Sequence, residues 1–298
     1  MYKQITSNKR KSFLLIGIFI IFVIFLGWLF GQFTGDSYGA LVAAVAISLF
    51  MAVTSFYGGD KVALWTAGAK GPISKNDNPY VYRLVENLCI TGGVPLPKIY
   101  LIPDQAPNAF ATGRDPKHAS IALTTGIMER LENEELEGVI AHELSHVKNY
   151  DTRLMMIVIV LVGIVALLSD WLLRFRFFGG RRSDREEGGQ LGAILLIIGI
   201  VLAILSPLIA KLIQLAVSRK REFLADADGA LLTRYPEGLA KALEKISNYK
   251  EPMKRANDAT AHLYFANPFG AKTQNFFHKL FSTHPPAEER INILRKMV

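Results

Sequence analysis

Two histidines and a glutamate lie within five residues of one another in the stretch VIAHELSHVKNY, residues 139–150. His142 and His146 are four residues apart, so on a helix both imidazoles project from one face and can bind a single metal ion. Glu143 lies one step round that helix, where it can take a proton from a metal-bound water without itself being a ligand. The spacing therefore predicts a hydrolytic zinc site.

Such a site needs a third protein ligand, because a catalytic zinc ion keeps its fourth position open for water. The candidates are Asp151, Glu222, Asp226, His262, His278 and His284. Glu222 and Asp226 are at i and i+4 of the predicted helix SRKREFLADADGALL, so they share one face. One of these carboxylates can bind zinc while the other accepts the free N–H of a ligand histidine. An exposed helix with ordinary Arg/Glu pairs is the alternative.

The zinc motif is followed almost at once by an apolar run, one of four in this chain of 298 residues, half of which are hydrophobic. The run 12–35 contains no charged residue, and it is long enough for a helix to cross a hydrocarbon core of about 30 Å. The other runs are 37–59, 154–173 and 191–210. With a mean hydropathy of +0.24, they predict four transmembrane helices in two hairpins. Buried core helices of a soluble protein are the alternative.

The placement of lysine and arginine predicts the orientation of these helices, because cytoplasmic loops carry an excess of positive charge. The segment before the first run is basic and the link at Asp36 carries no Lys or Arg, so we expect both termini in the cytoplasm. The first run exceeds the apolar length of a cleavable signal, which predicts a retained anchor. The link 174–190 disagrees, since it holds five arginines although two crossings would place it outside. A re-entrant second hairpin is the alternative.

The charge balance and the cysteine content narrow the expected partners. The net charge of +8 is not taken as a nucleic-acid signature, because the basic residues gather beside the apolar runs, as expected at an anionic membrane surface. The single cysteine, Cys89, excludes an intramolecular disulfide. We expect the lipid bilayer and protein substrates as partners, and no nucleic acid. The oligomeric state stays open.

The soluble part around the zinc motif is expected to mix helices and strands. Residues 79–93 have a helical stripe that ends at a glycine pair. Residues 97–103 predict a short strand between prolines, and NAFATG at 108–113 with HASIALTTG at 118–126 predicts a following pair. Asn133 is expected to cap the helix that carries the zinc motif.

Four motifs resemble those of the HtpX-type membrane zinc metalloproteases, in the order of that family and over essentially the whole chain. They are NAFATG, HELSH before an apolar run, EFLAD after the next run, and STHPPAEERI near the C-terminus. The resemblance implies zinc binding by His142, His146 and Glu222, with Glu143 as general base. Asp226 is then left as the carboxylate that supports a ligand histidine. The resemblance also implies an endopeptidase of the bacterial inner membrane that cleaves misfolded or damaged membrane proteins on the cytoplasmic side, in stress response and protein quality control.

The predicted fold class is therefore α+β, mainly helical, with four transmembrane helices and a cytoplasmic zinc-metalloprotease domain. The second membrane hairpin divides this domain in the sequence. We expect an N-terminal membrane hairpin at 1–59, a first catalytic part at 60–153, a second hairpin at 154–216 and a second catalytic part at 217–298. The second hairpin would bring His146 and Glu222 to the same membrane surface.

Three further residues are candidates for handling the substrate. An unfolded chain can be held as a strand added to a sheet edge, and residues 108–112 are the expected edge, with Asn108 bonding the substrate backbone. A turn residue after Pro107 is the alternative. A donor near the metal stabilises the oxyanion. His284 and Arg290 are the candidates, because the resemblance places their segment by the site; a helix-leading turn with a surface arginine is the alternative.

Two other functions stay open. A CAAX-type prenyl-protein protease shares HExxH and a distal glutamate, but it is built around more than four membrane spans. A non-catalytic membrane scaffold or a transporter belongs to a different class. Ionisable residues deep within the spans would favour transport, and the four runs contain almost none. The intact Glu143 argues against an inactive scaffold.

Overall fold

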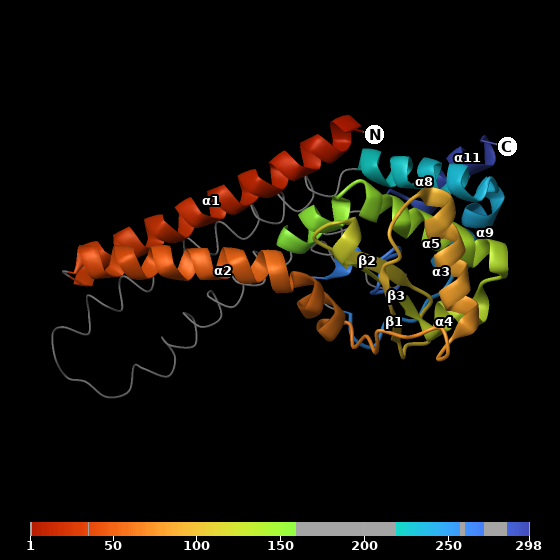
Figure 1. Cartoon of the computed structure of the whole chain (residues 1–298), viewed down its shortest axis with the longest axis horizontal. Coiled ribbons are helices and arrows are strands. Elements are labelled where there is room, and N and C mark those ends of the chain that lie inside the picture. Colours follow the sequence, from red (N-terminus) through yellow and green to blue (C-terminus); the bar gives the residue numbers. More distant parts are fainter. Residues whose placement is uncertain are drawn as a thin grey trace.

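The computed structural model describes residues 2–34, 36–158, 199, 219–256, 260–270 and 285–297. These residues form a globular part from which two long helices project side by side (Figure 1). The mainly helical α+β class is confirmed. Most of the two later apolar runs, the arginine-rich link between them and His284 lie outside the described residues.

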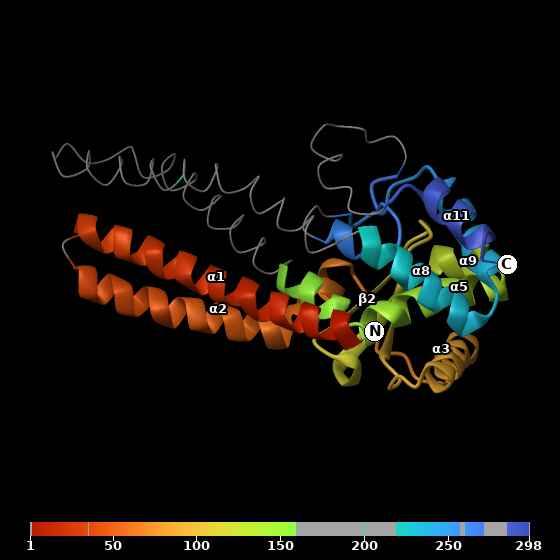
Figure 2. The same ribbon diagram turned by 90° about the horizontal axis from the view of Figure 1, so that it is seen from above.

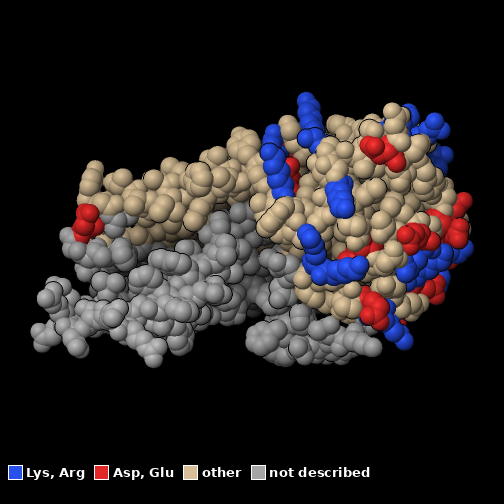
Figure 3. Space-filling view, turned by 90° about the horizontal axis from the view of Figure 1, so that it is seen from below, with Lys and Arg blue, Asp and Glu red and all other residues tan. Residues whose placement is uncertain are grey.

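The projecting helices are α1 (Tyr2–Thr34) and α2 (Ser37–Thr66), which pack against each other as an antiparallel pair (Figure 2). Asp36 caps α2, its carboxylate accepting a hydrogen bond from the Gly39 N–H at 2.8 Å. Within the described ranges, Leu41–Thr66 is the one helical segment that is long and apolar enough to cross a membrane. On the face drawn in Figure 3, charged side chains are scattered over the globular part, whereas acidic atoms mark the tip of the helix pair.

The pair is joined to the globular part through the end of α2. This helix continues through Asp60 and Lys61, and Ala63 and Leu64 are buried beside the sheet residues Ile102 and Phe110. A helix that ends inside a packed core cannot swing freely, because its movement would expose buried apolar surface.

Within the described residues the sheet has three strands, and all three were predicted. They are β1 (Lys98–Ile102), β2 (Ala109–Gly113) and β3 (Ala119–Thr124). Their order is β1-β3-β2, with β1 parallel and β2 antiparallel to β3, so β2 is an edge strand. A short 3-10 turn, η1 (Pro116–His118), connects β2 to β3.

The other helices pack on the sheet or on one another, and some of them carry the site residues. They are α3 (Pro79–Gly92), α4 (Thr125–Arg130), α5 (Asn133–Lys148), α8 (Arg219–Thr233), α9 (Pro236–Ser247) and α11 (Ala287–Arg295), with a second 3-10 turn η2 (Ala261–Leu263). The predicted end of α3 is confirmed, since Gly93 caps it with a left-handed φ of 62°.

One predicted cap is wrong by a residue. The helix α5 is capped by Glu132, whose backbone N–H donates to the Glu135 carboxylate at 2.9 Å, and Asn133 is the first helical residue. Asn133 is instead engaged through its side chain, which accepts from the Tyr80 hydroxyl and donates to Glu137. The reciprocal Glu132–Glu135 pair satisfies the helix end in its place.

Candidate metal centre

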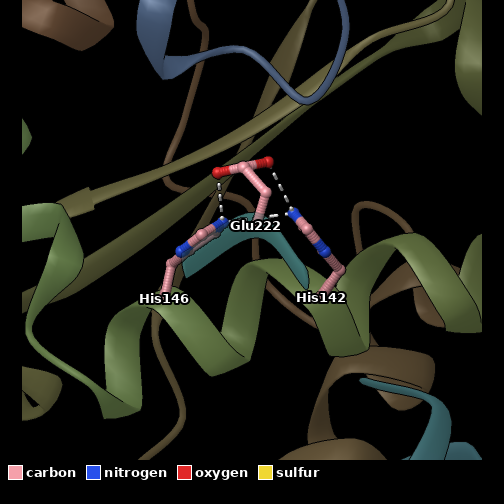
Figure 4. Close-up of side chains that lie close together, drawn as sticks. All are labelled: His142, His146 and Glu222. Carbon is pink, nitrogen blue, oxygen red and sulfur yellow. Dashed lines mark hydrogen bonds and ion pairs between the residues drawn. The ribbon is translucent and has the colours of Figure 1, made fainter. Parts of the chain in front are cut away.

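Two crossing helices position the site, and a glycine lets them approach closely. In α8, a Cβ on Gly229 would lie only 3.1 Å from the backbone nitrogen of His142 in α5. Any larger side chain would push α8 outward, so the glycine allows Glu222, two turns earlier, to reach over the histidines. Figure 4 shows both imidazoles rising from α5 and the Glu222 carboxylate lying between them.

The three side chains converge on one point. His142 Nε2 lies 3.7 Å from one Glu222 carboxylate oxygen, and His146 Nε2 lies 3.5 Å from the other. The two Nε2 atoms are 3.1 Å apart, and the three candidate ligand atoms all lie within 4.8 Å of one another. All three residues are buried.

A carboxylate behind each imidazole fixes its tautomer. His142 Nδ1 lies 2.9 Å from Asp226 Oδ1, and His146 Nδ1 lies 3.1 Å from Asp151 Oδ2. A carboxylate at Nδ1 favours the proton there, which leaves the Nε2 lone pair facing the common point. Two such lone pairs at 3.1 Å repel unless a cation or a proton lies between them. The residues therefore fit a divalent metal ion held by two histidines and one glutamate.

The sequence interpretation had treated Asp151 only as a possible third ligand, and it missed this role. Its position five residues after His146 was the available signal, but the geometry depends on the turn after α5. Tyr150 has a φ of +61° there, and this left-handed residue redirects the chain after α5. Residues 151–158 are again helical and buried.

The two histidines differ electrostatically when no metal is bound. Burial, together with the positive Arg290, lowers the pKa of His142 to about 4 against the opposing bond to Asp226. Burial also disfavours the charged form of His146, but the bond to Asp151 and the negative Glu222 outweigh it and raise the pKa to about 9. At neutral pH one proton is therefore held at the point where a cation would bind.

Arg290 is part of the site and is not a surface arginine. It is 2% exposed, and its Nε and NH2 groups donate to the two Asp226 oxygens at 2.8 and 2.6 Å. Its NH1 lies 3.8 Å from the Glu222 carboxylate. Burial alone would raise the pKa of Asp226, but Arg290 and His142 lower it overall. In this structure Arg290 holds the carboxylate that orients His142.

Glu143 is buried and lines the same small cavity as the three candidate ligands. The cavity has a volume of about 10 Å³, which is room for about one water molecule. Ala111 of β2 lines it from one side, and Tyr264 and Phe265 line it from another. A peptide does not fit into this space.

Asn108 differs from the expectation that it offers a free group to a substrate. It is 3% exposed, and its amide nitrogen donates to the Ala266 carbonyl at 2.9 Å. Its amide oxygen accepts from the N–H groups of Ala109 and Ala266 at 3.0 and 3.1 Å. The Phe265 N–H donates to the Ala109 carbonyl at 2.8 Å. Asn108 thus fixes the 264–266 segment along the start of β2.

The structure therefore brings together most of the candidate site residues. His142, Glu143, His146, Glu222, Asp226 and Arg290 share one buried cluster. Asn108 lies at the start of the neighbouring strand. His284 lies outside the described residues, so its position relative to the cluster is not defined.

An HExxH helix, a glutamate from a second helix and an adjoining sheet edge are the elements of a metalloprotease site. The chain belongs to peptidase family M48, whose family model matches residues 75–298. The predicted HtpX-type resemblance is confirmed by curated relatives at 40–47% identity over the full chain.

Three relatives called "Protease HtpX homolog" illustrate the similarity. The one from Tropheryma whipplei (strain Twist) is 47% identical over 100% of this chain and 98% of its own length. That from Dictyoglomus thermophilum is 44% identical over 99% and 94%, and that from Streptococcus gordonii is 40% identical over 100% of both chains. Ste24p from S. mikatae has a similar fold, with a TM-score of 0.50 at 19% identity over 99% of this chain and 67% of that one.

Proposed function

We propose that this metalloprotease is a membrane-embedded, zinc-dependent endopeptidase that cleaves misfolded or damaged membrane proteins on the cytoplasmic side, in protein quality control. The observation that carries the proposal is the convergence of His142, His146 and Glu222 in a domain joined to an apolar helix pair. The donor set of two imidazoles and one carboxylate is the one that catalytic zinc takes in hydrolases.

The proposed location is the bacterial inner membrane, with four crossings and both termini in the cytoplasm. Support comes from α2, which is long and apolar enough to cross, and from its exposed side chains, such as Phe50 at 69%. Large apolar side chains along a two-helix rod are unfavourable in water and favourable in lipid. The second pair of crossings and the cytoplasmic orientation rest on the sequence.

Each residue of the cluster has a proposed role in peptide hydrolysis. His142, His146 and Glu222 would hold the ion, which when bound would supply the Lewis acidity that makes water a nucleophile near neutral pH. Glu143 lines the cavity beside them, where its carboxylate would accept a proton from the attacking water and pass it to the leaving amine. Asp151, Asp226 and Arg290 keep the imidazoles in one orientation, and His284 is proposed as a donor to the oxyanion.

The proposed substrate surface is the outer edge of β2, whose start is covered by the 264–266 segment. The Thr124 N–H of β3 donates to the Asn108 carbonyl at 3.0 Å. In an antiparallel ladder, hydrogen-bonded and non-hydrogen-bonded pairs alternate along the strand. The backbone N–H and C=O of Ala111 therefore point away from β3, toward the cavity that Ala111 lines. A substrate strand paired there would pass the metal, provided that the 264–266 segment moves aside.

The proposal is tested by zinc quantification and proteolysis on the purified full chain in detergent. We expect about one zinc ion per chain, cleavage of an unfolded protein, loss of cleavage on chelation and recovery on adding zinc. A protein that binds no zinc and cleaves nothing would favour the membrane scaffold. Cleavage confined to prenylated C-terminal peptides would favour the CAAX-type protease.

A further inference from the structure

An asparagine of the first projecting helix is buried in the globular part. Asn8 of α1 is 3% exposed. Its amide donates to Asp151 Oδ1 at 2.7 Å and to the Asn149 carbonyl at 2.9 Å, across 143 and 141 residues of sequence. A buried amide that lost both acceptors would be costly to leave unbonded, so these contacts dock the end of α1.

The carboxylate that Asn8 contacts is the one that orients a candidate ligand. Asp151 Oδ2 faces His146 Nδ1 at 3.1 Å. Asp151 Oδ1 accepts both the Asn8 amide and Arg221 NH1, the latter at 3.1 Å. With these two donors on one oxygen, the carboxylate has one orientation and presents its other oxygen to the imidazole.

Each of the two histidines is oriented by an aspartate, but different residues hold the two aspartates. Behind His142, Asp226 is held by Arg290 of α11. Behind His146, Asp151 is held by Arg221 of α8 and, in addition, by Asn8 of α1, which lies just before the uncharged run of that helix. The second arrangement connects a candidate ligand to the projecting pair by a chain of side-chain hydrogen bonds.

We propose that Asn8 is a positioning residue, through which the docked end of α1 sets the orientation of His146 and so the affinity of the site for its metal ion. The inference rests on the proposed zinc site. It makes the N-terminal helix a component of the metal centre as well as an anchor. Separation of α1 from the globular part removes one donor from Asp151 and loosens His146.

The test uses the purified full chain with Zn²⁺ alone as the probe. In Asn8→Ala we expect release of Zn²⁺ to a chromophoric chelator to accelerate about tenfold, the lower end of the range for partners of metal ligands. The isosteric Asn8→Asp replaces the donating amide by a carboxylate facing Asp151, and it should accelerate release at least as much. With cobalt in place of zinc, both variants should change the visible absorption spectrum, which a purely structural role would not alter.

Ser12→Ala is the matched control. Ser12 is one turn further along α1 and 1% exposed, but its hydroxyl donates only to the Asn8 carbonyl of its own helix. We expect the parent rate and spectrum in this variant. In an Asp151→Asn background, Asn8→Ala should accelerate zinc release little further, because Asn8 acts on His146 through Asp151.

Parent-like zinc release in both Asn8 variants, or equal acceleration in Ser12→Ala, would overturn the inference while leaving the zinc site intact. A parent chain that binds no zinc would instead refute the proposed function.

Discussion

At the scale of single residues, the site is a set of groups that fix one another's protons. Each candidate histidine ligand has a carboxylate at Nδ1, and each carboxylate has an arginine at its other oxygen. Burying one charged side chain alone costs free energy, because the charge is removed from water. In the complete network each charge has partners of opposite sign, and their attraction offsets that cost. The network therefore holds the Nε2 atoms in place before any ion arrives.

Mutations can distinguish the metal ligand, Glu222, from the carboxylate that orients His142, Asp226. Glu222→Ala should abolish stoichiometric zinc binding, because it removes a direct ligand. Asp226→Asn keeps the ligands and should weaken zinc affinity or activity by about 10–100-fold. Zinc content after dialysis measures both. The opposite ranking would show that Asp226 is the ligand and Glu222 its support.

Zinc affinity should depend on pH through His146. Its pKa of about 9 means that the metal-free site holds a proton at neutral pH, whereas His142, with a pKa of about 4, does not. Zinc must displace that proton, so affinity should rise by about tenfold per pH unit between pH 6 and 8 and level off above pH 9. Competition with a chelator of known pH dependence measures this. An affinity that is constant from pH 6 to 8 would contradict it.

At the scale of elements, the site depends on how closely α8 lies on α5. The sequence predicted that Glu222 and Asp226 share a helix face, because i and i+4 spacing is local. It could not decide which of them reaches the ion, since that choice depends on the height of α8 over α5, which Gly229 sets. The contacts of Asp151 and Asn8 could not be predicted either, because they are not local in the sequence. Asp151 reaches His146 across the turn at Tyr150, and Asn8 contacts Asp151 across 143 residues.

Gly229→Val tests this packing. A side chain there would meet the backbone of His142, and overpacking costs about 1–3 kcal/mol. We expect lower thermal stability and reduced zinc occupancy, measured by a melting curve in detergent and by metal analysis. Gly58→Val is the control, because that helical glycine has nothing within 4 Å. Equal zinc occupancy in the two variants would show that the close approach does not matter.

At the scale of the whole molecule, the projecting pair meets the globular part at two places near the site. The end of α2 is packed in the cluster that includes Leu263 and Tyr264, beside the cavity, and α1 reaches Asp151 through Asn8. The uncharged runs were visible in the sequence, because a long apolar run is recognised from composition alone. Their docking was not, because it depends on individual buried contacts such as Asn8 with Asp151.

The predicted topology can be tested with single cysteines on a Cys89→Ser background. Positions in 60–150 and 217–298 should react with a membrane-impermeant reagent only when it reaches the cytoplasmic side, and positions in 174–190 only from outside. Intact and opened cells provide the two conditions. Labelling of 174–190 from the cytoplasm would replace the second pair of crossings by a re-entrant hairpin.

The most direct test of the central claim is the Glu143→Gln variant, assayed for zinc and for proteolysis of an unfolded protein. The amide keeps the size of the side chain but cannot accept the proton. We therefore expect about one zinc ion per chain, parent-like stability, and activity reduced by about 10²–10⁴-fold. Undiminished proteolysis in the purified, zinc-loaded variant would contradict the assignment of Glu143 as the general base.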